Sequence, residues 1–105
     1  MDNEIILFEE KQYELKFNEK TIETVEAITK KPFMDVLISG SPVFSLSDLR
    51  QYFANGLYAV DGGRIPIRHG STVFDGVLKE KGFAFLNMLV INTIQRDCPF
   101  FFLAD

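Results

Sequence analysis

Alternating apolar and polar residues near the start of the chain predict a β-hairpin. In one strand, Tyr13–Phe17, apolar side chains alternate with Glu14 and Lys16, a period of two that gives the strand one apolar face. The segment before it, Ile5–Phe8, is apolar on both faces, and the polar residues Glu9–Gln12 connect the two strands. Because a lone two-stranded hairpin is marginally stable in water, we expect other elements to cover it.

A helical period follows the hairpin. Asn18 is a good N-cap, because its side-chain oxygen can accept a hydrogen bond from a backbone N–H of the first turn. Ile22, Val25 and Ile28 then fall three residues apart, on one face of a helix. Pro32 keeps the residue before it out of helical geometry, so we expect the helix to end there.

A second helix is predicted in the middle of the chain. It starts at Ser45, whose spacing from Asp48 is that of a capping box. Gly56 is placed to close the helix in a left-handed conformation. Its buried side is marked by apolar residues, Leu46, Leu49, Phe53 and Leu57.

Two more helices are predicted in the last third. The helical period first breaks at a turn, Asp61–Gly63, and at Arg64–Arg68, which is best interpreted as extended. Ser71 is placed to cap a third helix that ends at Gly82. The fourth, Phe83–Arg96, is apolar nearly all round, so we expect it to be central in the domain or shared with another subunit.

These elements predict an α+β fold, in which an N-terminal antiparallel β-hairpin packs on a mainly helical domain of about four helices. The chain has 105 residues, of which 47% are apolar and 25% charged, and this composition fits one domain over residues 1–105.

The chain closes on consecutive phenylalanines, Phe100–Phe102. Burying one phenylalanine stabilises a fold by roughly 1.5–3 kcal/mol, but neighbours in an extended segment point to opposite faces. Two alternatives follow. Either the tail is sandwiched between elements of the domain, for instance as an added strand, or part of it meets another chain.

Charge argues against a nucleic-acid partner. The net charge is −4, and residues 1–30 hold eight carboxylates against four lysines, which alone gives −4. An acidic first third repels phosphate, so we expect no nucleic-acid binding. We also expect no membrane segment and no signal peptide, because the start is acidic and the apolar runs are short.

The residues that carry chemistry are sparse. His69 is the only histidine and Cys98 the only cysteine, and no supporting motif surrounds either. A zinc site would need more nitrogen and sulfur ligands than this. The one local positive cluster, Arg64, Arg68 and His69, is either a solvated loop or a contact for an acidic segment. We therefore expect neither an enzyme nor a cofactor or metal.

Five segments follow one another in a familiar order: Tyr13–Asn18, Thr21–Thr29 with its Val25-Glu26 pair, Thr29–Phe33, Ser47–Leu49 and Ala54–Leu57. With them the chain resembles, over residues 4–95, the tail assembly chaperones of long-tailed bacteriophages and prophages of Gram-positive hosts. Two positions depart from that family. Its usual glycine in the hairpin turn is replaced by Glu9-Glu10-Lys11, and its glycine after Thr29 is Lys30.

The resemblance implies a non-enzymatic assembly factor that works in the cytoplasm of a bacterial host. Such proteins coat the tape-measure protein, recruit tail-tube subunits around it and leave before the tail is finished. An alternative is a small phage structural protein, such as a connector or tail-completion ring component, that stays in the particle.

We further expect the protein to be a homo-oligomer and to bind its partners through apolar residues near its C-terminus. The surplus apolar surface of the fourth helix and of the tail is the reason. The predicted protein-binding residues are Leu86, Leu89, Val90, Ile94, Phe100, Phe101 and Phe102.

Overall fold

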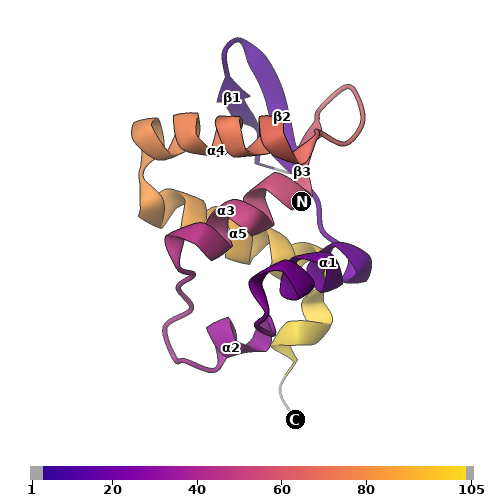
Figure 1. Cartoon of the computed structure of the whole chain (residues 1–105), viewed down its shortest axis with the longest axis vertical. Helices are drawn as coiled ribbons and strands as arrows, with labels where there is room; N and C mark the ends of the chain where they lie inside the picture. The colour runs from indigo at the N-terminus through magenta and orange to yellow at the C-terminus, as the bar shows by residue number, and fades with distance from the viewer. Residues whose placement is uncertain (1–3, 104–105) are drawn as a thin grey trace.

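A computed structural model describes residues 4–103 and shows a small sheet at one end of a group of helices (Figure 1). The elements in chain order are β1 (Ile6–Phe8), β2 (Lys11–Leu15), α1 (Glu19–Thr29), α2 (Met34–Leu37), α3 (Leu46–Gly56), β3 (Leu57–Ala59), α4 (Ile67–Lys81), α5 (Phe83–Asp97) and the 3-10 helix η1 (Pro99–Phe102). The predicted α+β class is confirmed, with one strand (β3) and two short helices (α2 and η1) more than the pattern indicated.

The sheet is antiparallel, with strand order β1-β2-β3. Ile6 pairs with Tyr13, and Leu15 pairs with Leu57. The sequence pattern does not predict the third strand; Leu57, expected on the buried side of a helix, is the first residue of this strand. It follows α3 without any intervening loop, so the local pattern contains no sign of the change.

The hairpin turn is tighter than predicted. Only Glu9 and Glu10 lie between the strands, and both have positive φ, 50° and 66°. Two consecutive left-handed residues are the mark of a type I′ turn, which matches the twist of the strands it joins. A type I′ turn usually has asparagine and glycine at these two positions. Two glutamates adopt this conformation here because the paired strands on either side impose it.

The cap predicted for α1 is confirmed. Asn18 Oδ1 accepts a hydrogen bond from the Thr21 backbone N–H at 2.9 Å. At the other end, Lys30 adopts a left-handed conformation with φ 61°, and its N–H donates to the Glu26 carbonyl. The helix therefore ends at Thr29 by a left-handed cap at Lys30, and Pro32 comes two residues after that cap.

We expect Lys30→Gly to stabilise the protein by about 0.5–1 kcal/mol. A residue with a Cβ is strained in the left-handed region, and glycine is not, although glycine loses more chain entropy on folding. The matched control is Lys31→Gly, because Lys31 pairs with Asp48 at 3.0 Å and is not left-handed. Urea unfolding checks both variants. Equal destabilisation by the two would contradict the prediction.

The second predicted helix is α3, and its Ser45 cap is confirmed: Ser45 Oγ accepts from the Asp48 backbone N–H at 3.2 Å. Two details of the prediction were wrong. Gly56 is not left-handed; it is required because a Cβ there would come within 2.6 Å of the Phe17 ring. Leu46 lies on the outer side of the first turn and is 45% exposed.

The helix expected to begin at Ser71 begins earlier. In α4 the first residue is Ile67, preceded by Pro66, and the Gly70 N–H donates to the Pro66 carbonyl at 2.9 Å. Gly70 interrupted the pattern but is needed inside this helix, since a Cβ would lie 3.0 Å from the backbone of Ala54. The helix ends at Gly82 as predicted, with φ 92°.

Helix α5 is central, which agrees with its all-round apolar sequence. It packs against α3, α4 and η1, and its inner residues belong to one core cluster that also contains the inner faces of the sheet and of α1. Among residues 4–103, no helix is both long enough and apolar enough to cross a membrane.

The end of α5 also holds the junction between β2 and α1. The Phe17 backbone N–H donates to Asp97 Oδ2 at 2.8 Å, and Arg96 Nη2 donates to the Leu15 carbonyl at 3.1 Å. Arg96 and Asp97 bind each other at 2.6 Å, and this hydrogen bond raises the pKa of the Arg96 guanidinium. The pair fixes the N-terminal hairpin to the last helix.

Candidate protein-binding surfaces

The four helix residues predicted to bind partners lie in the core. Leu86, Leu89, Val90 and Ile94 are all buried between α5 and its neighbours within this chain. Leu89, at 8% exposure, also lines a hollow along the outer side of α5, and partner binding by these four residues stays a prediction. The outer side of the same helix carries Met88, which is 51% exposed.

The phenylalanine tail is neither an added strand nor a free segment. It forms η1, in which Phe101 and Phe102 are half-buried against Phe33, with ring centroids 5.0 and 6.3 Å away. Phe100 points outward and is 49% exposed. Of the seven residues predicted to bind partners, Phe100 is thus the most accessible.

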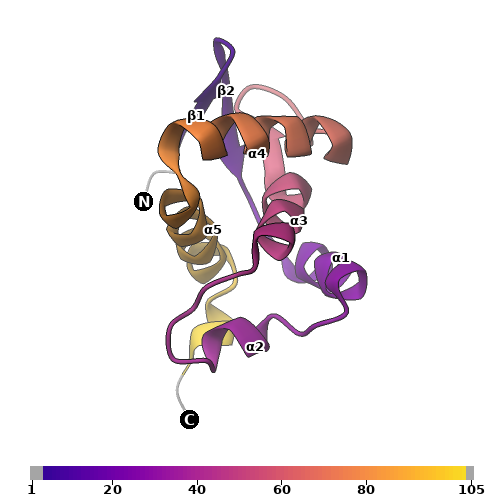
Figure 2. The ribbon, with the colours of Figure 1, turned by 60° about the vertical axis from the view of Figure 1, so that its left-hand side comes forward.

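Phe100 belongs to an exposed apolar surface that we name the α2–η1 surface. The two short helices lie side by side at the end of the molecule opposite the sheet (Figures 1 and 2). Its members are Met34, Ile38, Phe100 and Leu103, which are 39, 73, 49 and 75% exposed. Sequence reasoning missed Met34 and Ile38, although their spacing of four residues is a helical signal.

A second surface lies at the opposite end, along the outer edge of β1. A groove of about 650 Å³ runs between this strand and the junction of α4 with α5. Its walls come from residues 4–10 on one side and from Val77, Glu80, Lys81 and Phe85 on the other. We name it the β1 groove. It shares Glu4 and Phe85 with a hollow of about 550 Å³ along the outer side of α5.

The positive cluster is part of the scaffold. Arg64 Nη2 donates to the Asn55 carbonyl at 2.8 Å, and Arg64 forms an isolated β-bridge with Tyr58. The His69 ring lies 3.1 Å, Nε2 to Oη, from Tyr13. These contacts fix the loop before α4 to α3 and to the sheet. Arg68, in the first turn of α4, is exposed.

Cys98 has the properties of a packed thiol. It is fully buried directly after α5, and burial, followed by the charges of Asp97 and Glu19, raises its pKa. A raised pKa keeps the sulfur protonated at neutral pH, which is the inert form. Residues 4–103 contain no group of three or more histidine, cysteine or carboxylate side chains placed to hold a metal ion.

Tyr52 makes the fold sensitive to alkaline pH. Burial, and after it the carboxylates of Glu26 and Asp48, raises the pKa of the Tyr52 phenol well above its ordinary value. The folded state therefore holds the proton more tightly than the unfolded state. This stabilisation is complete below about pH 10, the unfolded pKa of tyrosine, and is lost as the pH rises further.

We expect the urea midpoint of unfolding to fall between about pH 10 and pH 12. The Cys98 thiol contributes in the same direction, because its pKa is also raised. Tyr52→Phe removes the phenol, so its midpoint should fall less over that window than that of the unmodified protein. Equal slopes in the two proteins would show that Tyr52 does not cause the dependence.

Comparison of the chain with protein-family models, with curated proteins and with solved structures found no match.

Proposed function

We propose that this protein is a non-enzymatic tail assembly chaperone that acts in the cytoplasm of a bacterial host. In this role it coats the tape-measure protein and recruits tail-tube subunits during assembly. The proposal starts from the sequence resemblance. The observation that carries it further is the backbone conformation at the positions where the chain departs from the family.

Three residues other than glycine have positive φ in residues 4–103: Glu9, Glu10 and Lys30. They fall in the hairpin turn and directly after Thr29, the places where the family has glycine and this chain does not. Glycine is the residue that takes positive φ without strain. At these positions the backbone of this chain has the conformation that glycine adopts most easily, although the residues are glutamate and lysine. This agreement with the family's glycine positions supports the resemblance.

The residues that carry the resemblance have structural roles. Val25 is fully buried, and Glu26 Oε2 accepts from the Phe33 backbone N–H at 2.7 Å, so that the pair joins α1 to α2. Gly56 lets α3 approach Phe17, and its carbonyl accepts from the Lys16 N–H at 2.9 Å. These motifs therefore support a shared fold, and partner contacts must come from other residues.

The α2–η1 surface is the part of the molecule best suited to contact the tape-measure protein. Its four exposed apolar side chains lie on, or directly after, two adjacent short helices, with aromatic packing beneath them. An amphipathic helix binds to such a surface through its apolar stripe. Coating a long helical protein requires many weak contacts of this kind, and self-association through Phe100 would add copies along it.

Co-expression with the tape-measure protein tests the proposal. We expect the chaperone to increase the soluble fraction of that protein several-fold. A variant with Ile38→Asp and Phe100→Asp should lose this effect, because a charge in an apolar contact is costly. The control is Val60→Asp, an exposed apolar position in the loop after β3. No gain in solubility with the unmodified protein would refute the chaperone role.

Mass spectrometry of finished particles tests the structural-protein alternative. A chaperone leaves before completion, so its copies should be absent, whereas a connector or ring component would be abundant. Light scattering over a range of concentrations tests self-association. There Phe100→Asp is the informative variant, because Phe101 packs on Phe33 and its replacement would also disturb the fold.

A further inference from the structure

We infer that the β1 groove binds an extended segment of another protein, basic and apolar in alternation, as a fourth strand of the sheet. This inference does not depend on the chaperone role. It rests on three features of the groove: an open strand edge, an apolar floor and an acidic rim.

The outer edge of β1 is unpaired within residues 4–103, because the strand order is β1-β2-β3. Bonded and non-bonded pairs alternate in an antiparallel ladder, and the pair that closes a two-residue turn is bonded. Phe8 and Lys11 close this turn, so Leu7, paired with Gln12, is in a non-bonded pair. Its backbone N–H and C=O therefore point to the open edge, where an added strand can bind them.

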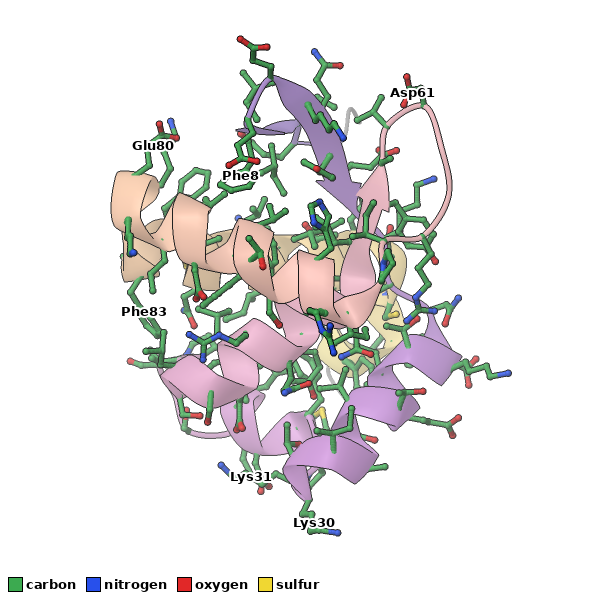
Figure 3. All side chains as sticks on the ribbon, turned by 45° about the horizontal axis from the view of Figure 1, so that its top comes forward. Phe8, Lys30, Lys31, Asp61, Glu80 and Phe83 are labelled. Atoms are coloured by element: carbon green, nitrogen blue, oxygen red, sulfur yellow. The ribbon has the colours of Figure 1, made fainter. Side chains whose placement is uncertain are left out.

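The floor of the groove is apolar. Phe8 lies between the hairpin and α4 (Figure 3), and it packs over Gly76 so closely that a Cβ there would come within 2.1 Å of the ring. Val77 and Phe85 continue this floor beside the strand edge. Alternate side chains of an added strand would face these residues, and the others would face away from the helices.

The rim of the groove is acidic. It carries Glu4, Glu9, Glu10 and Glu80 against Lys81, a balance of −3. Within residues 4–103 none of the four carboxylates forms an ion pair. Glu80 projects from the end of α4 on the side of the hairpin (Figure 3). Basic side chains on the added strand would meet these charges.

The same charges argue against a second copy as the occupant. Pairing β1 with β1 of another molecule would bring two sets of the hairpin glutamates to one edge, and like charges at close range disfavour such pairing. A basic segment from a different protein avoids this repulsion. Backbone hydrogen bonds would hold it, and charge would select it.

A synthetic peptide of seven residues, alternating lysine and valine and blocked at both ends, is a suitable probe. Titration into ¹⁵N-labelled protein should shift the amides of Ile5, Leu7 and residues 77–85 and leave the α2–η1 surface unchanged. A glutamate–valine peptide of equal length should bind at least 10-fold more weakly. So should the lysine–valine peptide N-methylated at alternate residues, which cannot complete the ladder.

The variant Glu9→Asn with Glu10→Gly separates binding from folding. It removes two rim charges and places the preferred residues in the type I′ turn, so the protein stays folded. We expect its affinity for the lysine–valine peptide to fall roughly 3- to 20-fold and to become less sensitive to salt. Leu7→Pro removes the edge donor and should weaken binding, whereas Leu7→Val should not.

Three outcomes would overturn the inference. The first is a lysine–valine peptide that leaves the β1 amides unshifted. The second is equal binding of the lysine and glutamate peptides. The third is a concentration-dependent shift of Ile5 and Leu7 without peptide, which would assign the edge to a second copy of this chain.

Discussion

Phe33→Ala is expected to destabilise the protein by about 3–5 kcal/mol, the cost of deleting a fully buried phenylalanine. Phe33 is 1% exposed, and its ring lies 5.0 to 6.3 Å from four other aromatic rings. Those rings come from three separate parts of the chain: Phe44, Tyr52, and the pair Phe101 and Phe102. Small domains have a total stability of about 5–15 kcal/mol, so the loss is a large fraction of it.

The position of the lost ring also predicts where the structure loosens. Phe33 is the contact between α2 and η1, so hydrogen exchange should accelerate first in those two helices and later in α3 and α5. Urea unfolding gives the total effect. The control is Phe100→Ala, because Phe100 is exposed and touches mainly Phe101. A cost below about 1 kcal/mol for Phe33→Ala would show that the aromatic cluster refills the space.

Asn87→Leu is expected to cost about 2–4 kcal/mol, although leucine is apolar and similar in size. Asn87 is a buried polar residue on the inner side of α5. Its Oδ1 accepts from the Phe44 backbone N–H at 2.9 Å, and its Nδ2 donates to the Pro42 carbonyl at 3.0 Å. Leucine would leave both backbone groups without their partner, at about 1–3 kcal/mol each.

The loop between α2 and α3 should become accessible in the same variant, because Asn87 fastens it to α5. Limited proteolysis of that loop, together with urea unfolding, measures the effect. Asn92→Leu is the matched control, since Asn92 is an exposed asparagine of the same helix, and its replacement should change stability by less than about 0.5 kcal/mol. Similar results for the two variants would mean that Asn87 does not hold the loop.

Sequence reasoning succeeded where the decisive interactions are local. Asn18 and Ser45 bond to backbone groups three residues away, so the starts of α1 and α3 followed from short motifs. Gly82 ends α4 for the same local reason. The α+β class followed from the hairpin and these helices together.

Local reasoning failed where distant segments decide the structure. The strand β3 exists because β2, some 40 residues earlier, offers an edge to residues that directly follow a helix. Gly56 was expected to close a helix, yet it is required by close approach to Phe17, and Gly70 is required inside α4 by close approach to Ala54. The residues near each glycine in the sequence do not show which distant residue will pack against it.

The predicted binding residues show the same limit. A helix that is apolar nearly all round has no periodic signal for its buried side, so the α5 sequence could not separate Leu86 from Met88. Packing against α3 and α4 makes the distinction: Leu86 is in the core and Met88 is outside. In the phenylalanine tail, contact with Phe33, which lies more than 60 residues earlier, likewise decides that Phe101 and Phe102 are half-buried while Phe100 is exposed.

The bonds from Phe17 and Leu15 to the end of α5 span 80 and 81 residues of chain. During synthesis the hairpin leaves the ribosome well before Arg96 and Asp97, because these separations are long. The hairpin therefore has no anchor until α3, α4 and α5 have been made, and only then can the edge of β1 be held in place. Any nascent chain stalled before residue 97 would carry an unanchored, apolar hairpin, and such a segment is a natural target for the cell's quality-control machinery.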